Sequence, residues 1–233
     1  MVGGLTTADS FTRTDLDSHA DTACFGHNAL VVDPGTSHVT VYPFKKGLGS
    51  ATDIPIVTAA IAYDQPLTGN TFIFIFHQAL YFGNDMDHNL LNSNQMRMNG
   101  LVVNECPKFL SPVPPTVTTH SLYAPDDDLL IPLYMHGVNS FFHSRKPSQE
   151  EYDQCPHIVM TASDPEWNPH SLDFANQEES ITDENGDVRN SNDQRERQAS
   201  RMMGSMNISA IESTAKQQCE LSNGNTLPRS PPS

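Results

Sequence analysis

The chain has 233 residues, with 13 Lys and Arg against 28 Asp and Glu and a formal net charge of -15. This acidity argues against direct nucleic-acid binding and against docking on an anionic membrane, since both need basic surface. No apolar run approaches the ~20 residues that span a bilayer, and residues 1–14 lack a signal-peptide core. We therefore expect a soluble, intracellular, cytoplasmic protein whose four scattered cysteines are free thiols.

The first hundred or so residues predict a series of strands that ends in one short helix. The predicted strands are residues 12–17, 29–32, 38–42, 54–63, 71–76 and, after a kink, 79–82. Phe72, Phe74 and Phe76 alternate, so we expect them to share one strand face and pack into the core. Asn92 or Ser93 is the expected N-cap of a helix that ends before Gly100. This mainly β order predicts a small closed β-barrel over residues 11–101.

The remainder of the chain predicts three segments of different character. Prolines interrupt residues 102–119, which indicates a linker. Residues 120–162 predict a small β-rich unit, with strands at 121–124, 129–135, 138–143 and 158–161 and a helix start near Pro147. Residues 163–233 are rich in Asn, Gln, Ser, Asp and Glu, so we expect a disordered acidic tail. The small polar residues 1–10 predict a disordered N-terminus.

One loop gathers polar side chains between two strand-like runs. Asp17, Ser18, His19 and Asp21 lie almost next to one another there. Aspartate is a poor strand residue. Asp17 is therefore either an ordinary turn residue or a carboxylate that takes part in chemistry.

The run Leu16-Asp17-Ser18-His19-Ala20-Asp21-Thr22 resembles the active-site loop of retropepsin-like aspartic proteases. A second block, residues 79–83 followed by 88–96, is similar to a stretch of the proteases of copia-type retrotransposons. Further similarity at residues 55–64, 137–142 and 145–147 extends the likeness over roughly residues 10–162. Many copia-type polyprotein fragments of this kind carry His where other retropepsins have Gly, as His19 does in this chain.

The resemblance implies a retropepsin-like barrel and a homodimeric aspartic endopeptidase that cleaves polypeptide substrates without a cofactor. Asp17 would be catalytic, and its mate would be Asp17 of a second copy, because the chain supplies one such loop. Two carboxylates about 3 Å apart share one proton, so one can act as base and the other as acid. The resemblance assigns loop support to Ser18, His19, Ala20, Asp21, Leu90 and Leu91. His19 is the departure, since histidine takes positive φ less easily than the usual Gly.

Two other interpretations stay open at this point. Asp17, His19 and Asp21 alternate, so on a strand they would share a face and could bind a divalent metal. Candidates for a further ligand are His27, His38 and His88. No familiar metal-ligand spacing supports this site, and we expect no metal. The second alternative is a catalytically inactive, retroelement-derived β-domain that binds peptides or assembles, with the Asp17 loop as a relic.

Overall fold

The computed structural model describes residues 12–43, 47 and 49–189. The chain divides into one unit that ends at Pro169 and a second that begins at His170, and each is described by itself. The predicted disordered N-terminus at 1–10 and the tail residues 190–233 lie outside the described residues.

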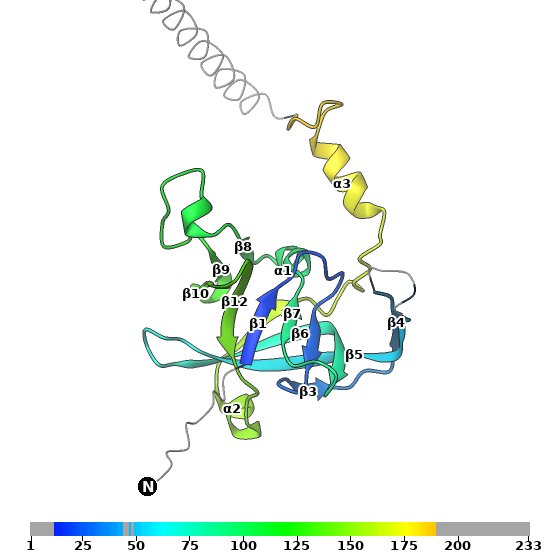
Figure 1. Ribbon diagram of the computed structural model, residues 1–233, viewed down its shortest axis with the longest axis vertical. Coiled ribbons are helices and arrows are strands. Elements are labelled where there is room, and N and C mark those ends of the chain that lie inside the picture. The colour runs from blue at the N-terminus through cyan, green and yellow to red at the C-terminus, as the bar shows by residue number, and fades with distance from the viewer. Residues whose placement is uncertain (1–11, 44–46, 48, 190–233) are drawn as a thin grey trace, which may run out of the picture. The chain divides into compact units, whose positions relative to one another are not determined.

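The first unit is mainly β and is built on one large sheet (Figure 1). Within the described residues this sheet has 10 strands in the order β11-β12-β1-β7-β2-β6-β5-β3, with β13 paired to β6 and β4 to β5. A second sheet of 3 strands has the order β10-β9-β8. The strands are β1 (Thr12–Leu16), β2 (Cys24–Gly26), β3 (Leu30–Asp33), β4 (His38–Val41), β5 (Ala51–Asp64), β6 (Thr71–Gly83), β7 (Asn89–Leu91), β8 (Val102–Asn104), β9 (Ser121–Ala124), β10 (Leu129–Pro132), β11 (Tyr134–His136), β12 (Asn139–Ser144) and β13 (His157–Thr161). In the described residues the path runs openly from β11 to β3, and the closed barrel expected from the sequence is not found.

The long β5–β6 hairpin is the centre of the large sheet. Phe74 and Phe76 are fully buried in the main core, and Phe72 packs against it, which confirms the predicted core face. Ile73 and Ile75 belong to a second cluster, so both faces of β6 are covered. The predicted kink between residues 76 and 79 is a bulge, because β6 has an extra residue where Val57 pairs with Ala79 and Ala59 with Phe76.

Residues 120–162 are not a separate unit, contrary to the prediction. β12 pairs antiparallel with β1, and β13 pairs parallel with β6. Phe142 of β12 is fully buried, and its ring lies 6.0 Å from the ring of Phe74 in an edge-on contact. A hydrophobic pattern over β12 cannot say which sheet the strand joins, and its apolar side chains complete the same core.

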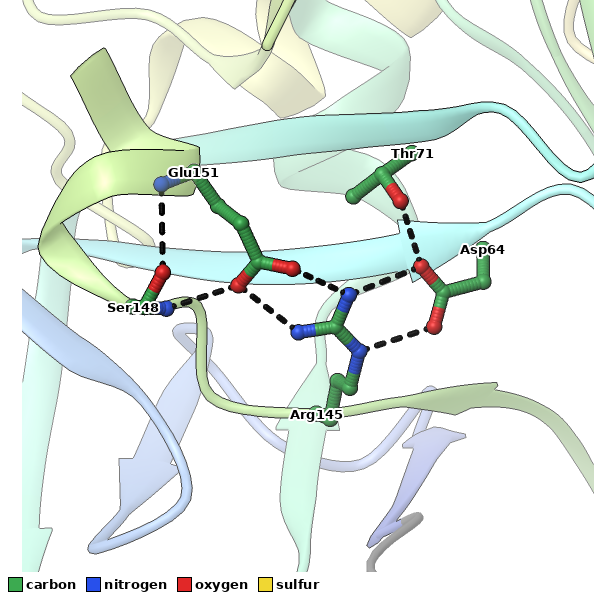
Figure 2. A network of polar contacts seen from close by, with 5 residues as sticks. All are labelled: Asp64, Thr71, Arg145, Ser148 and Glu151. Carbon is green, nitrogen blue, oxygen red and sulfur yellow. Dashed lines mark hydrogen bonds and ion pairs between the residues drawn. The ribbon is translucent and has the colours of Figure 1, made fainter. Parts of the chain in front are cut away.

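The guanidinium of Arg145, just past β12, fixes this later segment to the β5–β6 hairpin (Figure 2). Its Nε and Nη2 donate to the two carboxylate oxygens of Asp64 at 2.8 and 2.9 Å. Its Nη1 and Nη2 donate to the carboxylate of Glu151 at 2.8 and 2.6 Å. Thr71 also donates to Asp64, at 2.7 Å. Arg145 thus holds two carboxylates from different elements, a geometry that the planar guanidinium suits.

The predicted linker at 102–119 also contributes to the fold. β8 lies within it and pairs antiparallel with β9, with Val103 opposite Leu122. Val103, Leu122 and Ile131 belong to the main hydrophobic core. The linker prediction is therefore wrong at its N-terminal end, where β-branched residues cover the core ahead of the prolines. The short 3-10 helix Lys108–Leu110 follows.

Three α-helices lie in the described residues, and the first two begin with side-chain caps. α1 (Ser93–Met98) has the predicted N-cap, Asn92, whose side chain accepts the N–H of Gln95. α2 (Gln149–Gln154) begins with a capping box between Ser148 and Glu151. α3 (Asp173–Ile181) lies in the second unit. The described part of the predicted tail, residues 163–189, therefore contains regular structure.

Candidate active site

β7 lies between β1 and β2, the two strands that the Asp17 loop connects. β7 runs parallel to β1, with Leu16 opposite Leu91, and antiparallel to β2, with Cys24 opposite Leu90. The loop at residues 17–23 must therefore cross the end of β7. The N–H of Asp17 donates to the carbonyl of Leu91 at 3.0 Å, which places Asp17 directly at that crossing.

The carboxylate of Asp17 is oriented by the loop itself. Its Oδ1 accepts the backbone N–H of His19 at 2.8 Å. The side chain of Asp17 is 37% exposed, and that of His19 is 96% exposed. The imidazole Nδ1 of His19 lies 4.0 Å from Oδ1 of Asp17 and 3.4 Å from the hydroxyl of Ser18. The loop thus presents an accessible carboxylate with one backbone donor already directed at it.

The histidine at position 19 does not prevent this backbone contact. Among the described residues, the non-glycine positions with positive φ are Asp53, Gln78, His120 and Asp128, and His19 is not one of them. The N–H of His19 reaches Asp17 from an ordinary backbone conformation, while the ring points to solvent. The conformational objection raised by the sequence therefore does not apply to this loop.

The end of β7 and the start of α1 support the loop from below. Leu91 is fully buried, and Leu90 is partly buried. The side-chain amide of Asn92 donates to the carbonyl of Ala20, and its Oδ1 accepts the N–H of Gln95 at 2.6 Å. Asn92 therefore caps α1 and holds the loop at the same time. The structure thus brings together the two blocks found in the sequence, around Asp17 and around Leu90.

Gln95 and Trp167 also hold the loop, and sequence reasoning missed both. Oε1 of the buried Gln95 accepts the N–H of Ala23 at 2.9 Å. The indole N–H of Trp167 donates to the carbonyl of Asp21 at 3.1 Å and to the hydroxyl of Thr22 at 3.2 Å. A lone tryptophan at the start of a polar segment was the available signal for Trp167, since such a large ring needs a surface to cover.

Cys24, at the end of the loop, is an unreactive thiol. Burial, together with the nearby negative charges of Asp17 and Asp21, raises the pKa of Cys24 to about 12. Its Sγ lies 3.2 Å from the carbonyl of Thr22, to which it donates. A neutral thiol is neither a nucleophile nor a good metal ligand, so the loop's available chemistry rests on its carboxylates.

Metal binding by Asp17, His19 and Asp21 gains no support from the arrangement of the described side chains. No group of three or more His, Cys, Asp or Glu residues that could hold a metal ion is found in the part of the chain that the structure describes.

Comparison with protein-family models, with curated proteins and with solved structures found no match to this chain. None of the helices described is long and apolar enough to cross a membrane. The interpretation of the site therefore rests on its own geometry.

Proposed function

We propose that the chain is a retropepsin-like aspartic endopeptidase of copia-type origin, with Asp17 as its catalytic residue. One observation carries the proposal. The Asp17 carboxylate is accessible, accepts the N–H of His19, and sits where the loop crosses the end of β7. A carboxylate that is oriented by one backbone N–H, on a residue whose own N–H is bonded to β7, is preorganised for chemistry, since little reorganisation is needed when a substrate binds.

The proposed reaction needs two carboxylates, and one copy of the chain supplies one. In the described residues, the polar contacts of Asp17 go to Leu91 and His19, and none goes to another carboxylate. A symmetric dimer would bring Asp17 of a second copy to the first, because a two-fold axis places the same residue on both sides of an interface. The exposed His19 rings would then also lie close to that axis.

The two Asp17 carboxylates would share one proton, because two negative charges so close together cannot both persist. The ionised carboxylate takes a proton from water as the water oxygen attacks the peptide carbonyl carbon. The protonated carboxyl gives its proton to the carbonyl oxygen. The resulting tetrahedral species collapses when the carboxyl that took the water proton gives it to the amide nitrogen, which leaves as an amine. The other carboxylate takes a proton from a hydroxyl of the tetrahedral species, so the pair again holds one proton. Activity then requires the singly protonated pair and is expected to peak in acid.

The test is cleavage of a mixed peptide library by the full chain between about pH 4 and 7. Asp17→Asn is the test variant. Asp126→Asn is the matched control, since it removes the same charge from an exposed site far along the chain. Sedimentation at the assay concentration reports whether the chain is a dimer.

Acid-peaked cleavage that is lost in Asp17→Asn and kept in Asp126→Asn would support the proposal. A folded dimer without cleavage would contradict it and leave the inactive peptide-binding or assembly domain as the better interpretation. Cleavage that survives Asp17→Asn would assign the chemistry to other residues.

A further inference from the structure

Residues 162–169, which follow β13, form a strap that is fixed to β6 through Gln78. The side-chain amide of Gln78 donates to the carbonyls of Ala162 and Pro165, both at 3.0 Å. Its Oε1 accepts the backbone N–H of Trp167 at 2.6 Å. One glutamine thus satisfies three backbone groups of a segment that lacks a sheet partner of its own.

Gln78 occupies an unusual backbone position to do this. Its backbone φ is +55°, a conformation that residues other than Gly, Asn and Asp rarely adopt. It lies in the bulge of β6, where an extra residue re-aims the side chains. Gln78 has a strained backbone conformation, and its side chain makes three hydrogen bonds to the strap. We infer that these hydrogen bonds offset the conformational free energy that the strained backbone costs.

The strap completes a ring of hydrogen bonds around the second half of the Asp17 loop. Ala23 of the loop donates to Gln95 at 2.9 Å, and Gln95 donates to the carbonyl of Gln78 over a longer 3.4 Å. Gln78 accepts from the backbone of Trp167, and the indole of Trp167 returns to Asp21 and Thr22. Each member is therefore held by two neighbours, and a shift of the loop at Asp21 or Thr22 would break its hydrogen bond to Trp167 in the strap.

We propose that Trp167 is a positioning residue for the Asp17 loop and that the strap is part of the candidate active site. The inference deepens the proposed function and rests on it for its catalytic meaning. The indole of Trp167 holds the loop at the carbonyl of Asp21 and at the hydroxyl of Thr22, so its action on Asp17 passes through these two residues. Small displacements of a catalytic group are costly, because reaction depends on near-attack geometry.

Amide hydrogen exchange on the full chain tests the positioning without any need for catalysis. Trp167→Phe keeps an aromatic ring and removes the indole donor. We expect exchange in peptides covering residues 17–23 to become about fivefold faster, as for the loss of one hydrogen bond. Peptides covering β5 and β12 should exchange at the wild-type rate. Tyr42→Phe, at an exposed aromatic residue, is the control and should change neither region.

Unchanged exchange at residues 17–23 in Trp167→Phe would overturn the proposal. An equal increase in β5 and β12 would also overturn it, since that pattern indicates general destabilisation.

The variant Gln78→Met provides a second test, because it removes the side-chain hydrogen bonds that fix the strap to β6. Trp167 is the single tryptophan of the chain, so its emission reports on the strap alone. Release of the strap should shift the fluorescence emission of Trp167 to longer wavelength. An unshifted spectrum would contradict the proposed ring of hydrogen bonds around the loop.

Turnover gives the third arm and separates this proposal from the proposed function. In a preparation that cleaves peptide, Trp167→Phe should lower kcat about fivefold and leave KM unchanged. A preparation that cleaves nothing would count against the proposed function, while the exchange result would still decide whether the strap positions the loop. A rise in KM with constant kcat would show that Trp167 binds substrate and does not position the loop.

Discussion

The strongest prediction for stability concerns Arg145, whose guanidinium binds Asp64 and Glu151 together (Figure 2). Replacing Arg145 with Met keeps much of the side-chain length and removes all four charge-assisted hydrogen bonds. It also leaves the two carboxylates near each other without a cation between them. Since Arg145 ties the segment after β12 to the β5–β6 hairpin, its replacement should lower the free energy of unfolding of the whole first unit.

The expected loss of unfolding free energy in Arg145→Met follows in part from the pKa of Glu151 and from the solvent exposure of its side chain. The Arg145 guanidinium, helped by the N–H of Ser148, lowers the pKa of Glu151 from 4.5 to about 2. That shift corresponds to at most about 3–4 kcal/mol. The Glu151 side chain is 30% exposed, so solvent screening reduces its share to about 1–2 kcal/mol. The two hydrogen bonds from Arg145 to the carboxylate of Asp64 add about 1–2 kcal/mol, as is typical of bonds to a charged group. We therefore expect Arg145→Met to lower the free energy of unfolding by about 2–4 kcal/mol.

The assay is urea unfolding followed by circular dichroism, with the midpoint and slope compared between variants. Arg145→Lys should lose about half as much, because an ammonium cannot donate paired bonds to two carboxylates. Arg97→Met is the matched control. The Arg97 side chain is 43% exposed and has one ion pair at 3.2 Å, so we expect a loss below about 1 kcal/mol. A loss in Arg145→Met no larger than in Arg97→Met would refute the reasoning.

Two further predictions concern pH and helix capping. Because the pKa of Glu151 is lower in the folded chain than its ordinary 4.5, its stabilisation is present above pH 4.5 and is lost as the pH falls toward about 2. Urea unfolding at a series of pH values should therefore show a wild-type advantage over Glu151→Gln at neutral pH that disappears near pH 2, and a constant difference would contradict it. Asn92→Ala removes the α1 cap and the bond to Ala20, and should lower the unfolding free energy by about 1–2 kcal/mol. Asn94 is a neighbouring, exposed residue, and Asn94→Ala should lower the free energy of unfolding in urea far less. Equal losses in the two variants would argue against the dual role of Asn92.

Local sequence was sufficient for most of the strands and for the starts of α1 and α2. The alternation of Phe72, Phe74 and Phe76 requires no knowledge of partners, since the side-chain period of a strand is two. The cap of α1 depends on Asn92 and the residues directly after it. The accessible loop at Asp17 also follows from local chemistry, because an aspartate after an apolar strand favours a turn.

Pairing between distant segments needed the tertiary structure. Arg145 is charged in any context, and only folding brings Asp64 and Glu151 to its two sides. The same holds for Phe142, which completes a core begun far earlier in the chain. A hydrophobic pattern states that a strand has a buried face and does not state what covers it.

The sequence by itself determined that the chain is acidic and carries one Asp-Ser-His-Ala-Asp run, and the order of its strand-like runs predicted a mainly β fold. The tertiary structure alone decided that β7 lies beneath that loop, that His19 presents its N–H to Asp17, and that Trp167 holds Asp21. These contacts join residues far apart in the chain, or depend on a backbone angle that the residue type does not fix. Local propensity contains neither kind of information, because both are set by which surfaces the whole chain must bury.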